Sequence, residues 1–116
     1  MNRFVNSASL AVFSILLAGA WLLVPVFKTQ AKDGAATFDA KCAMCHSSDG
    51  SGNSPMGKSM KVPDLRSKAV QSKSNTELYD VIAKGKSPMP GYASQLNKEE
   101  INELVAYIRH LGGKKK

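Results

Sequence analysis

The chain has 116 residues, which is enough for one small domain and leaves little room for a second. It carries 16 basic and 9 acidic residues, a formal net charge of +7, and part of this excess is the terminal run 114–116. No recognition helix and no interleaving of aromatic with basic residues accompanies the charge, so we do not expect nucleic acid as a partner. The two cysteines lie too close together to stabilise a domain of this size as a disulfide.

The segment 8–27 is an almost uninterrupted apolar run. Its length of about 20 residues matches the hydrocarbon core of a bilayer as a helix, and Trp21 and Phe27 lie where interfacial aromatic residues are common. The alternative is a signal peptide cleaved near Ala31, although its apolar core would then be long. We favour the anchor. We expect residues 1–31 to be a signal peptide or transmembrane anchor with a short linker, preceding an exported domain on the periplasmic side.

The domain itself is expected over residues 32–116. Asp33 can cap a first helix, whose alanine-rich sequence runs to about His46. Residues 47 to about 73 are dense in Gly, Pro and Ser, which predicts mostly loop. A loop this long is unusual in a small domain unless it wraps around something, and a large apolar cofactor would supply that role.

A second helix is predicted from Ser74, where Ser74 and Glu77 fit a capping box, to a stop at Gly85. The following segment 86–92 cannot be helical, because two prolines flank Met89.

The last helix is expected to begin after Asn97, with Glu100 completing a second capping box. Its apolar residues recur at helical spacing and end before two glycines. The stripe consists of Ile101, Leu104, Val105, Ile108 and Leu111. No alternating strand pattern occurs, so the predicted fold class is all-α.

The motif Cys42-Ala43-Met44-Cys45-His46 predicts covalent attachment of haem. Thiols three residues apart on a helix share one face and can reach two vinyl groups along one porphyrin edge. His46 would then be the proximal ligand of the iron. A thioredoxin-like pair would need a preceding strand, and a zinc site would need His110 as its fourth ligand; both are weaker interpretations.

With this motif, several smaller features make the chain resemble the class I, monohaem cytochrome c family over residues 33–112. They are Gly34, Phe38, Pro63-Asp64-Leu65, Met89-Pro90 and Tyr107. The resemblance implies a small cytochrome c fold, with three main helices and long loops wrapped around one covalently bound haem c and its iron. In this chain one apolar N-terminal helix would precede that fold.

The resemblance also assigns roles to individual residues. It implies that the first helix, through Gly34 and Phe38, crosses the last helix near Tyr107. It further implies that the Pro63 carbonyl accepts a hydrogen bond from the ring of the proximal histidine, and that Leu65 packs on the haem. Because the only tryptophan lies in the leader, Arg66 or a backbone N–H is the candidate to hold a haem propionate.

Met89 is the expected second axial ligand. The prolines on either side stiffen its backbone, and it matches the family's distal-ligand position. Met56 and Met60 lie in the flexible glycine- and serine-rich segment and are alternatives, while Met44 sits inside the motif.

The predicted function is one-electron transfer between redox partner proteins, an electron donor and an acceptor, in a respiratory or photosynthetic chain. Both axial positions would be filled and no paired carboxylates occur, so we do not expect an enzyme. Two alternatives stay open: a five-coordinate haem sensor or peroxidase, and a fixed haem subunit of a larger oxidoreductase complex. Four lysines are expected to border the exposed haem edge and steer a partner: Lys58, Lys61, Lys84 and Lys86.

Overall fold

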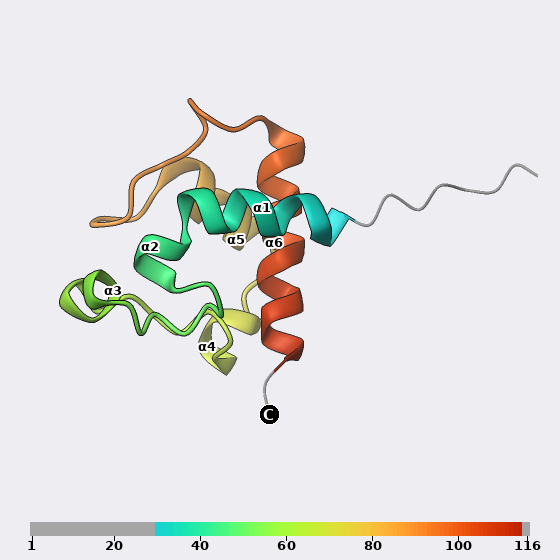
Figure 1. Ribbon diagram of the computed structural model, residues 1–116. Helices are drawn as coiled ribbons and strands as arrows, with labels where there is room; N and C mark the ends of the chain where they lie inside the picture. Colours follow the sequence, from blue (N-terminus) through green and yellow to red (C-terminus); the bar gives the residue numbers. More distant parts are fainter. Residues whose placement is uncertain (1–29, 115–116) are drawn as a thin grey trace, which may run out of the picture.

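The computed structural model describes residues 30–114, which form six helices and, within this range, no strand (Figure 1). The helices are α1 (Gln30–Lys41), α2 (Ala43–His46), α3 (Pro55–Met60), α4 (Lys68–Gln71), α5 (Asn75–Lys84) and α6 (Lys98–Gly113). The expected all-α class is confirmed for this range. The apolar segment 8–27 lies outside the described residues, and none of the helices in 30–114 has the length and apolarity needed to span a bilayer.

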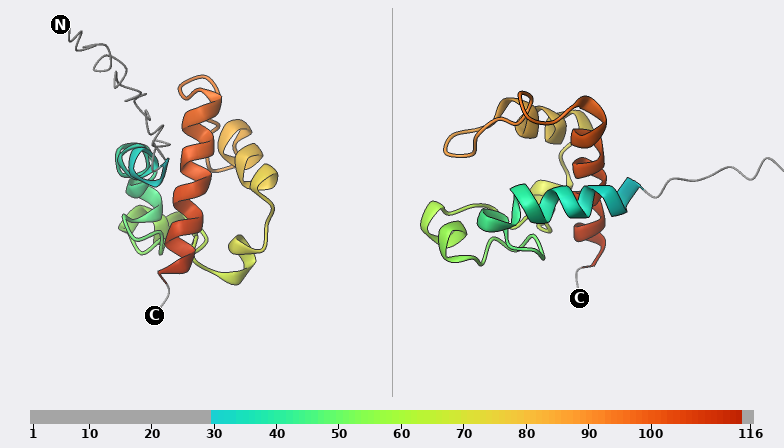
Figure 2. Two further views of the ribbon diagram at one scale, coloured as in Figure 1. Left: turned by 90° about the vertical axis from the view of Figure 1, so that its right-hand side faces the viewer. Right: turned by 45° about the horizontal axis from the view of Figure 1, so that its top comes forward.

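Helices α1 and α6 cross each other and are in contact, and both views in Figure 2 show them side by side. A Cβ added at Gly34 would collide with the main-chain carbonyl of Glu103 on α6, so only glycine allows this approach. Four residues further along α1, the Phe38 ring lies 5.2 Å from the Tyr107 ring, measured between centroids. The expected crossing near Tyr107 is therefore confirmed.

The core is built mainly on α6, whose apolar stripe is buried as the sequence predicted. The capping box forms at its start: Asn97 N donates to Glu100 Oε2 at 2.8 Å, and Glu100 N donates to Asn97 Oδ1 at 2.9 Å. Leu78 and Ile82 of α5 complete the core on one side and Phe38 of α1 on the other.

The second predicted capping box also forms, at the start of α5. Ser74 N donates to Glu77 Oε2 at 2.7 Å, and Glu77 N donates to Ser74 Oγ at 3.1 Å. The helix ends at Gly85, whose φ of 79° favours glycine.

The first helix differs from its predicted bounds at both ends. It already includes Gln30, the first residue that the structure describes, and so extends upstream of the predicted cap Asp33, through Gln, Ala and Lys, which are good helix formers. It also breaks at Cys42, where φ is −117°, before α2 resumes with His46 as its last residue. The motif therefore lies on a bend rather than on one continuous helix.

The segment 47–73, predicted to be mostly loop, contains two short helices that the sequence analysis did not identify. Ser54 caps α3 by accepting from Gly57 N at 2.9 Å, and Pro55 occupies the first helical position, where its missing N–H is harmless. Ser67 caps α4 in the same way through Val70 N. Serine and proline, which disfavour the interior of long helices, thus begin the short helices α3 and α4.

The segment around α4 is joined to α6 by polar side chains. Gln71 Nε2 donates to the carbonyl oxygens of Leu65 at 2.7 Å and Ile108 at 3.0 Å. Arg109 in turn donates to the carbonyls of Gln71 and Lys73. These bonds fix the lower end of the molecule in Figure 1 against the last helix.

Candidate functional site

A cavity of about 480 Å³ opens between two walls of the molecule. One wall comprises the end of α1, α2, α3 and residues 61–65; the other comprises α5 and residues 86–92. The right-hand view of Figure 2 places the segment after α5 across from α2 and α3. The volume lies in the range of small-molecule and cofactor sites, and most of the lining is apolar.

Both cysteines of the motif line this cavity as half-buried free thiols. The bend at Cys42 is held by main-chain bonds, with Cys42 N donating to Phe38 O at 2.8 Å and His46 N donating to Cys42 O at 2.9 Å. Burial raises the pKa of the Cys42 thiol to about 11, although the nearby Lys41 charge acts in the opposite direction. The thiol is therefore protonated at neutral pH.

His46 faces the same cavity from the end of α2. Its ring centroid lies 6.5 Å from that of Phe38, and burial lowers the pKa of its imidazole, which favours the neutral form that binds metals. Its Nδ1 atom is buried and has no hydrogen-bond partner, so the expected bond to the Pro63 carbonyl does not form in this structure.

Helix α3 is docked directly on the backbone of Cys45. Ser54 Oγ donates to the Cys45 carbonyl at 2.9 Å, and Ser54 N donates to Ser47 Oγ at 2.8 Å. A Cβ added at Gly57 would collide with the carbonyls of Cys45 and Gly52. The wall that bears the motif is thus fixed by close backbone contacts.

Met89 lines the opposite wall and is half-buried. Its backbone is held in a tight turn, where Lys86 N donates to Met89 O at 3.0 Å and Met89 N donates to Lys86 O at 2.8 Å. The turn is pinched at its base, because a Cβ on Gly85 would come within 2.6 Å of Gly91 N. These contacts add to the stiffness that the flanking prolines provide.

Two other methionines also reach the cavity. Met56 and Met60 line it from α3 and stay partly exposed, at 45% and 38%. Met44, which is 70% exposed, does not line it. Three methionine side chains therefore line one cavity. Met56 and Met60 lie on the wall that includes α3, and Met89 lies on the opposite wall.

Pro63 and Leu65 line the cavity as well, and Leu65 belongs to the buried core. Arg66 does not line it. Its guanidinium pairs with both carboxylate oxygens of Asp64 at 3.0 Å and lies 3.6 Å from Asp49. These carboxylates occupy the guanidinium, so the structure does not support a role for Arg66 toward a haem propionate.

The lining residues fit a covalently held haem. Two thiols sit beside an imidazole on one wall, a thioether lies on the other, and aliphatic side chains fill the space between them. The buried Nδ1 of His46, which has no hydrogen-bond partner, is an unsatisfied polar atom in the wall of this cavity.

Comparison with known proteins agrees with this chemistry. Residues 29–108 match the family described as "Cytochrome C oxidase, cbb3-type, subunit III". A cytochrome c6 of Synechococcus sp. is 35% identical over 89 residues, covering 76% of each chain. This chain is a small monohaem c-type cytochrome. Haem c with its iron, bound covalently, is the cofactor of this family and of this cytochrome.

Two further comparisons concern a longer relative in sequence and a solved structure of similar fold. The cbb3-type cytochrome c oxidase subunit FixP of Rhizobium etli is 35% identical over 83 residues, covering 69% of this chain and 27% of that protein. In fold, the solved KustC0563 c-type cytochrome superposes with a TM-score of 0.64 at 23% identity, over 68% of this chain and 96% of that one.

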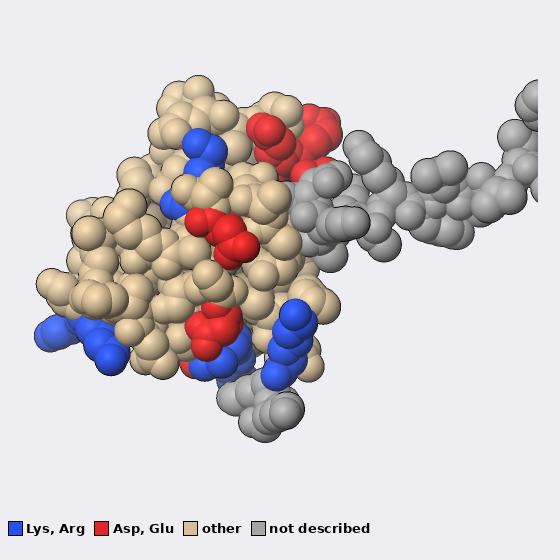
Figure 3. All heavy atoms as spheres, in the orientation of Figure 1, with Lys and Arg blue, Asp and Glu red and all other residues tan. Residues whose placement is uncertain are grey.

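The charges around the cavity of the cytochrome are of one sign. Its lining includes no Asp or Glu among residues 30–114 and four lysines: Lys41, Lys61, Lys73 and Lys86. In Figure 3 basic atoms gather over α3, whereas acidic atoms gather at the start of α6, where Glu99 and Glu100 lie in the first turn.

The sequence identified two of these four lysines. Lys61 and Lys86 were expected, but Lys58 and Lys84 do not line the cavity, and Lys84 pairs with Asp80 at 3.1 Å. Lys41 was not among the lysines expected near the haem edge. Its position directly before Cys42 could have identified it. Lys73 lies far from the motif in sequence, and no such position identifies it.

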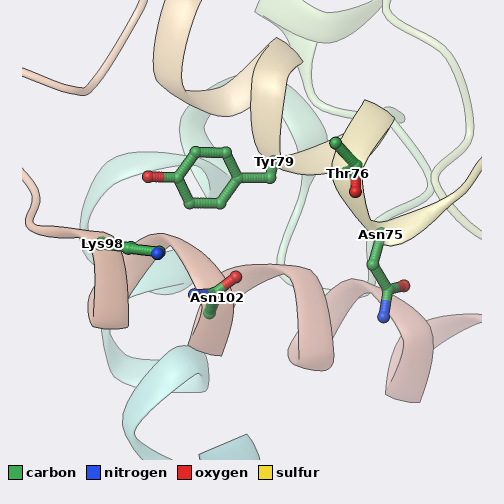
Figure 4. A pocket seen from close by; sticks show the side chains of 5 residues that line it. All are labelled: Asn75, Thr76, Tyr79, Lys98 and Asn102. Carbon is green, nitrogen blue, oxygen red and sulfur yellow. The ribbon is translucent and has the colours of Figure 1, made fainter.

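A second hollow, of about 250 Å³, lies between α5 and α6 (Figure 4). It is lined by Asn75, Thr76, Tyr79, Lys98 and Asn102. It holds no thiol, imidazole or thioether, so it offers nothing to a haem.

Proposed function

We propose that this cytochrome carries one electron at a time between redox partner proteins. Cys42 and Cys45 form the thioether links to haem c, and His46 and Met89 are the axial ligands of its iron. The observation that carries the proposal is that one cavity collects two thiols and an imidazole on one wall and a rigid methionine on the other. The bound haem supplies a one-electron couple, which His/Met ligation sets at a raised potential.

Met89 is favoured over Met56 and Met60 by its position. Met89 would hold the iron from the wall across the cavity from His46, whereas Met56 and Met60 lie on α3, which packs against α2, the helix that carries His46. Met89 is also the methionine whose backbone is held in a closed turn. We assign Pro63 and Leu65 to the haem pocket beside His46.

A second candidate function, a fixed haem subunit of a larger oxidoreductase complex, is supported by the similarity to a cbb3-type oxidase subunit. The similarity to cytochrome c6 over 76% of that protein favours the free carrier. The two differ in whether the native protein copurifies with a stable partner.

We further propose that residues 1–31 direct export to the periplasmic side and that residues 8–27 stay as a membrane anchor, with residues 32–116 forming the cytochrome domain. Intact-mass measurement of the protein from its native membrane tests this. A mature N-terminus at Lys32 would establish cleavage and a soluble carrier.

The axial assignment is tested with Met89→Ala in the haem-loaded protein. Without the thioether the iron becomes high-spin or water-ligated, the reduction potential falls, and the reduced protein gains carbon monoxide binding. Absorption spectra of both redox states measure this, after acid–acetone extraction has shown that the haem stays on the chain.

Met56→Ala and Met60→Ala are the matched controls and should leave the low-spin spectrum intact. If one of them loses the methionine band while Met89→Ala keeps it, the ligand is on α3. A wild type that is already five-coordinate and binds carbon monoxide would replace the carrier with a sensor or peroxidase.

A further inference from the structure

The segment 86–96, which carries Met89, meets α1 beside the haem-attachment motif. Two hydrogen bonds join this segment to α1, and each involves Lys41. Tyr92 Oη donates to the Lys41 carbonyl at 3.2 Å, and Lys41 Nζ donates to Gln95 Oε1 at 3.4 Å. Lys41 is the last residue of α1 and directly precedes Cys42.

Two main-chain bonds tie the same segment to α5. Tyr92 N donates to the Ile82 carbonyl at 2.9 Å, and Ala93 N donates to the Ala83 carbonyl at 3.1 Å. The segment is thus attached along one side to the end of α5 and reaches the opposite wall at Tyr92. The ring of Tyr92 itself lines the cavity.

Tyr92 has the chemistry that such a contact needs. Its half-buried ring packs against the core, and its hydroxyl reaches a main-chain carbonyl of the motif wall. Burial raises the pKa of Tyr92, so the hydroxyl keeps the proton that it donates.

We propose that Tyr92 is a positioning residue that latches the Met89 segment to α1 and thereby limits how often the axial site opens to added ligands. The proposal rests on the proposed function, in which haem lies between these two walls. Since a typical hydrogen bond contributes about 1 kcal/mol, removing the hydroxyl should raise the open fraction about five-fold.

The test is Tyr92→Phe in the full-length, haem-loaded protein. The measured quantity is the rate at which imidazole replaces the methionine ligand of the ferric iron, which requires the segment to open. We expect a rise of about five-fold with an unchanged spectrum before imidazole is added. Gln95→Ala, which removes the longer and more exposed bond, should give a smaller rise of about two-fold.

The matched control is Tyr79→Phe. Tyr79 is also half-buried and lies on α5, but it faces the second hollow and its hydroxyl makes no hydrogen bond to another described residue (Figure 4). Its imidazole rate should equal that of the wild type. Thermal unfolding of the variants is measured alongside, because a merely structural role would lower the melting temperature without a selective change in rate.

An imidazole rate for Tyr92→Phe equal to that of Tyr79→Phe, in a wild type that is six-coordinate, overturns the latch alone. A wild type whose iron binds imidazole or carbon monoxide with no ligand to displace overturns the proposed function itself. If Tyr92→Phe fails to fold, Gln95→Ala carries the test, and an unchanged rate there overturns the latch.

Discussion

The two halves of this cytochrome are stabilised in different ways. The half built from α1, α5 and α6 is held by apolar side chains, including Phe38, Ile101 and Leu104, which are the most completely buried. The half formed by residues 42–73 contributes only Leu65 and Val70 to the core of the described residues. There, backbone and hydroxyl hydrogen bonds determine the conformation, such as Gly52 N to His46 O at 2.8 Å and Leu65 N to Gly50 O at 2.8 Å.

This difference indicates that the two halves contribute differently to stability and to the geometry of the site. Side-chain packing gives the first half its own stability, whereas hydrogen bonds between exposed segments contribute less free energy and mainly fix geometry. The second half carries the thiols and the imidazole, so a haem bound to them would supply the apolar contact that this half lacks.

The largest expected effect comes from the core of the first half. Ile101→Ala should lower the free energy of unfolding by about 2–5 kcal/mol, because it leaves a cavity in a fully packed site that does not border the haem cavity. Urea unfolding of the haem-loaded protein measures the loss, and the haem spectrum should not change.

Leu65→Ala is the matched change in the second half. Leu65 lines the cavity, so its loss should disturb the haem spectrum as well as stability. Equal changes in the haem spectrum for Ile101→Ala and Leu65→Ala would contradict the expectation that Leu65 borders the haem and Ile101 does not.

An intermediate effect is expected from Gly57→Ala. The added methyl group would meet backbone carbonyls of Cys45 and Gly52, which cannot move without shifting the motif. We expect a loss of about 1–3 kcal/mol together with a perturbed haem spectrum. Gly113→Ala is the control, since nothing lies within 4 Å of its added Cβ, and it should be neutral or slightly stabilising. Similar losses in both variants would show that the tight docking of α3 is unimportant.

The smallest effect concerns the lysines of the cavity rim. Replacing Lys61 and Lys86 together by Gln should slow the reaction of the reduced protein with ferricyanide, an anionic oxidant, about two- to ten-fold at low ionic strength. Stopped-flow rates over a salt series measure this. The pair Lys58→Gln and Lys84→Gln removes the same charge away from the cavity and should have less effect; an identical salt dependence for both pairs would exclude local steering.

Features that depend on neighbours in sequence were the ones that could be predicted. Both capping boxes, the stop at Gly85 and the buried stripe of α6 follow from residues within one or two helical turns. The crossing of α1 and α6 came from the family resemblance, because a lone Gly34 does not indicate its partner.

Other features depend on contacts that no local pattern encodes. The segment 47–73 was predicted mostly as loop because Ser, Pro and Gly are poor in long helices, yet the same residues cap the single turns α3 and α4. Arg66 was one of two candidates for a propionate partner, and no local pattern indicates its pairing with Asp64 and Asp49. The motif predicted the thiols and the imidazole of the site, but not Lys73 or the reach of Tyr92 to Lys41.

The close approach at Gly34 also bears on the order of folding. Helix α1 begins the described chain and α6 ends it, so their contact closes a loop that contains all the other described elements. Capped single turns and short helices can form while this loop is still open, because their contacts are local. Because the Phe38 ring packs on Tyr107 of α6, the buried centre around Phe38 cannot be complete until this loop has closed.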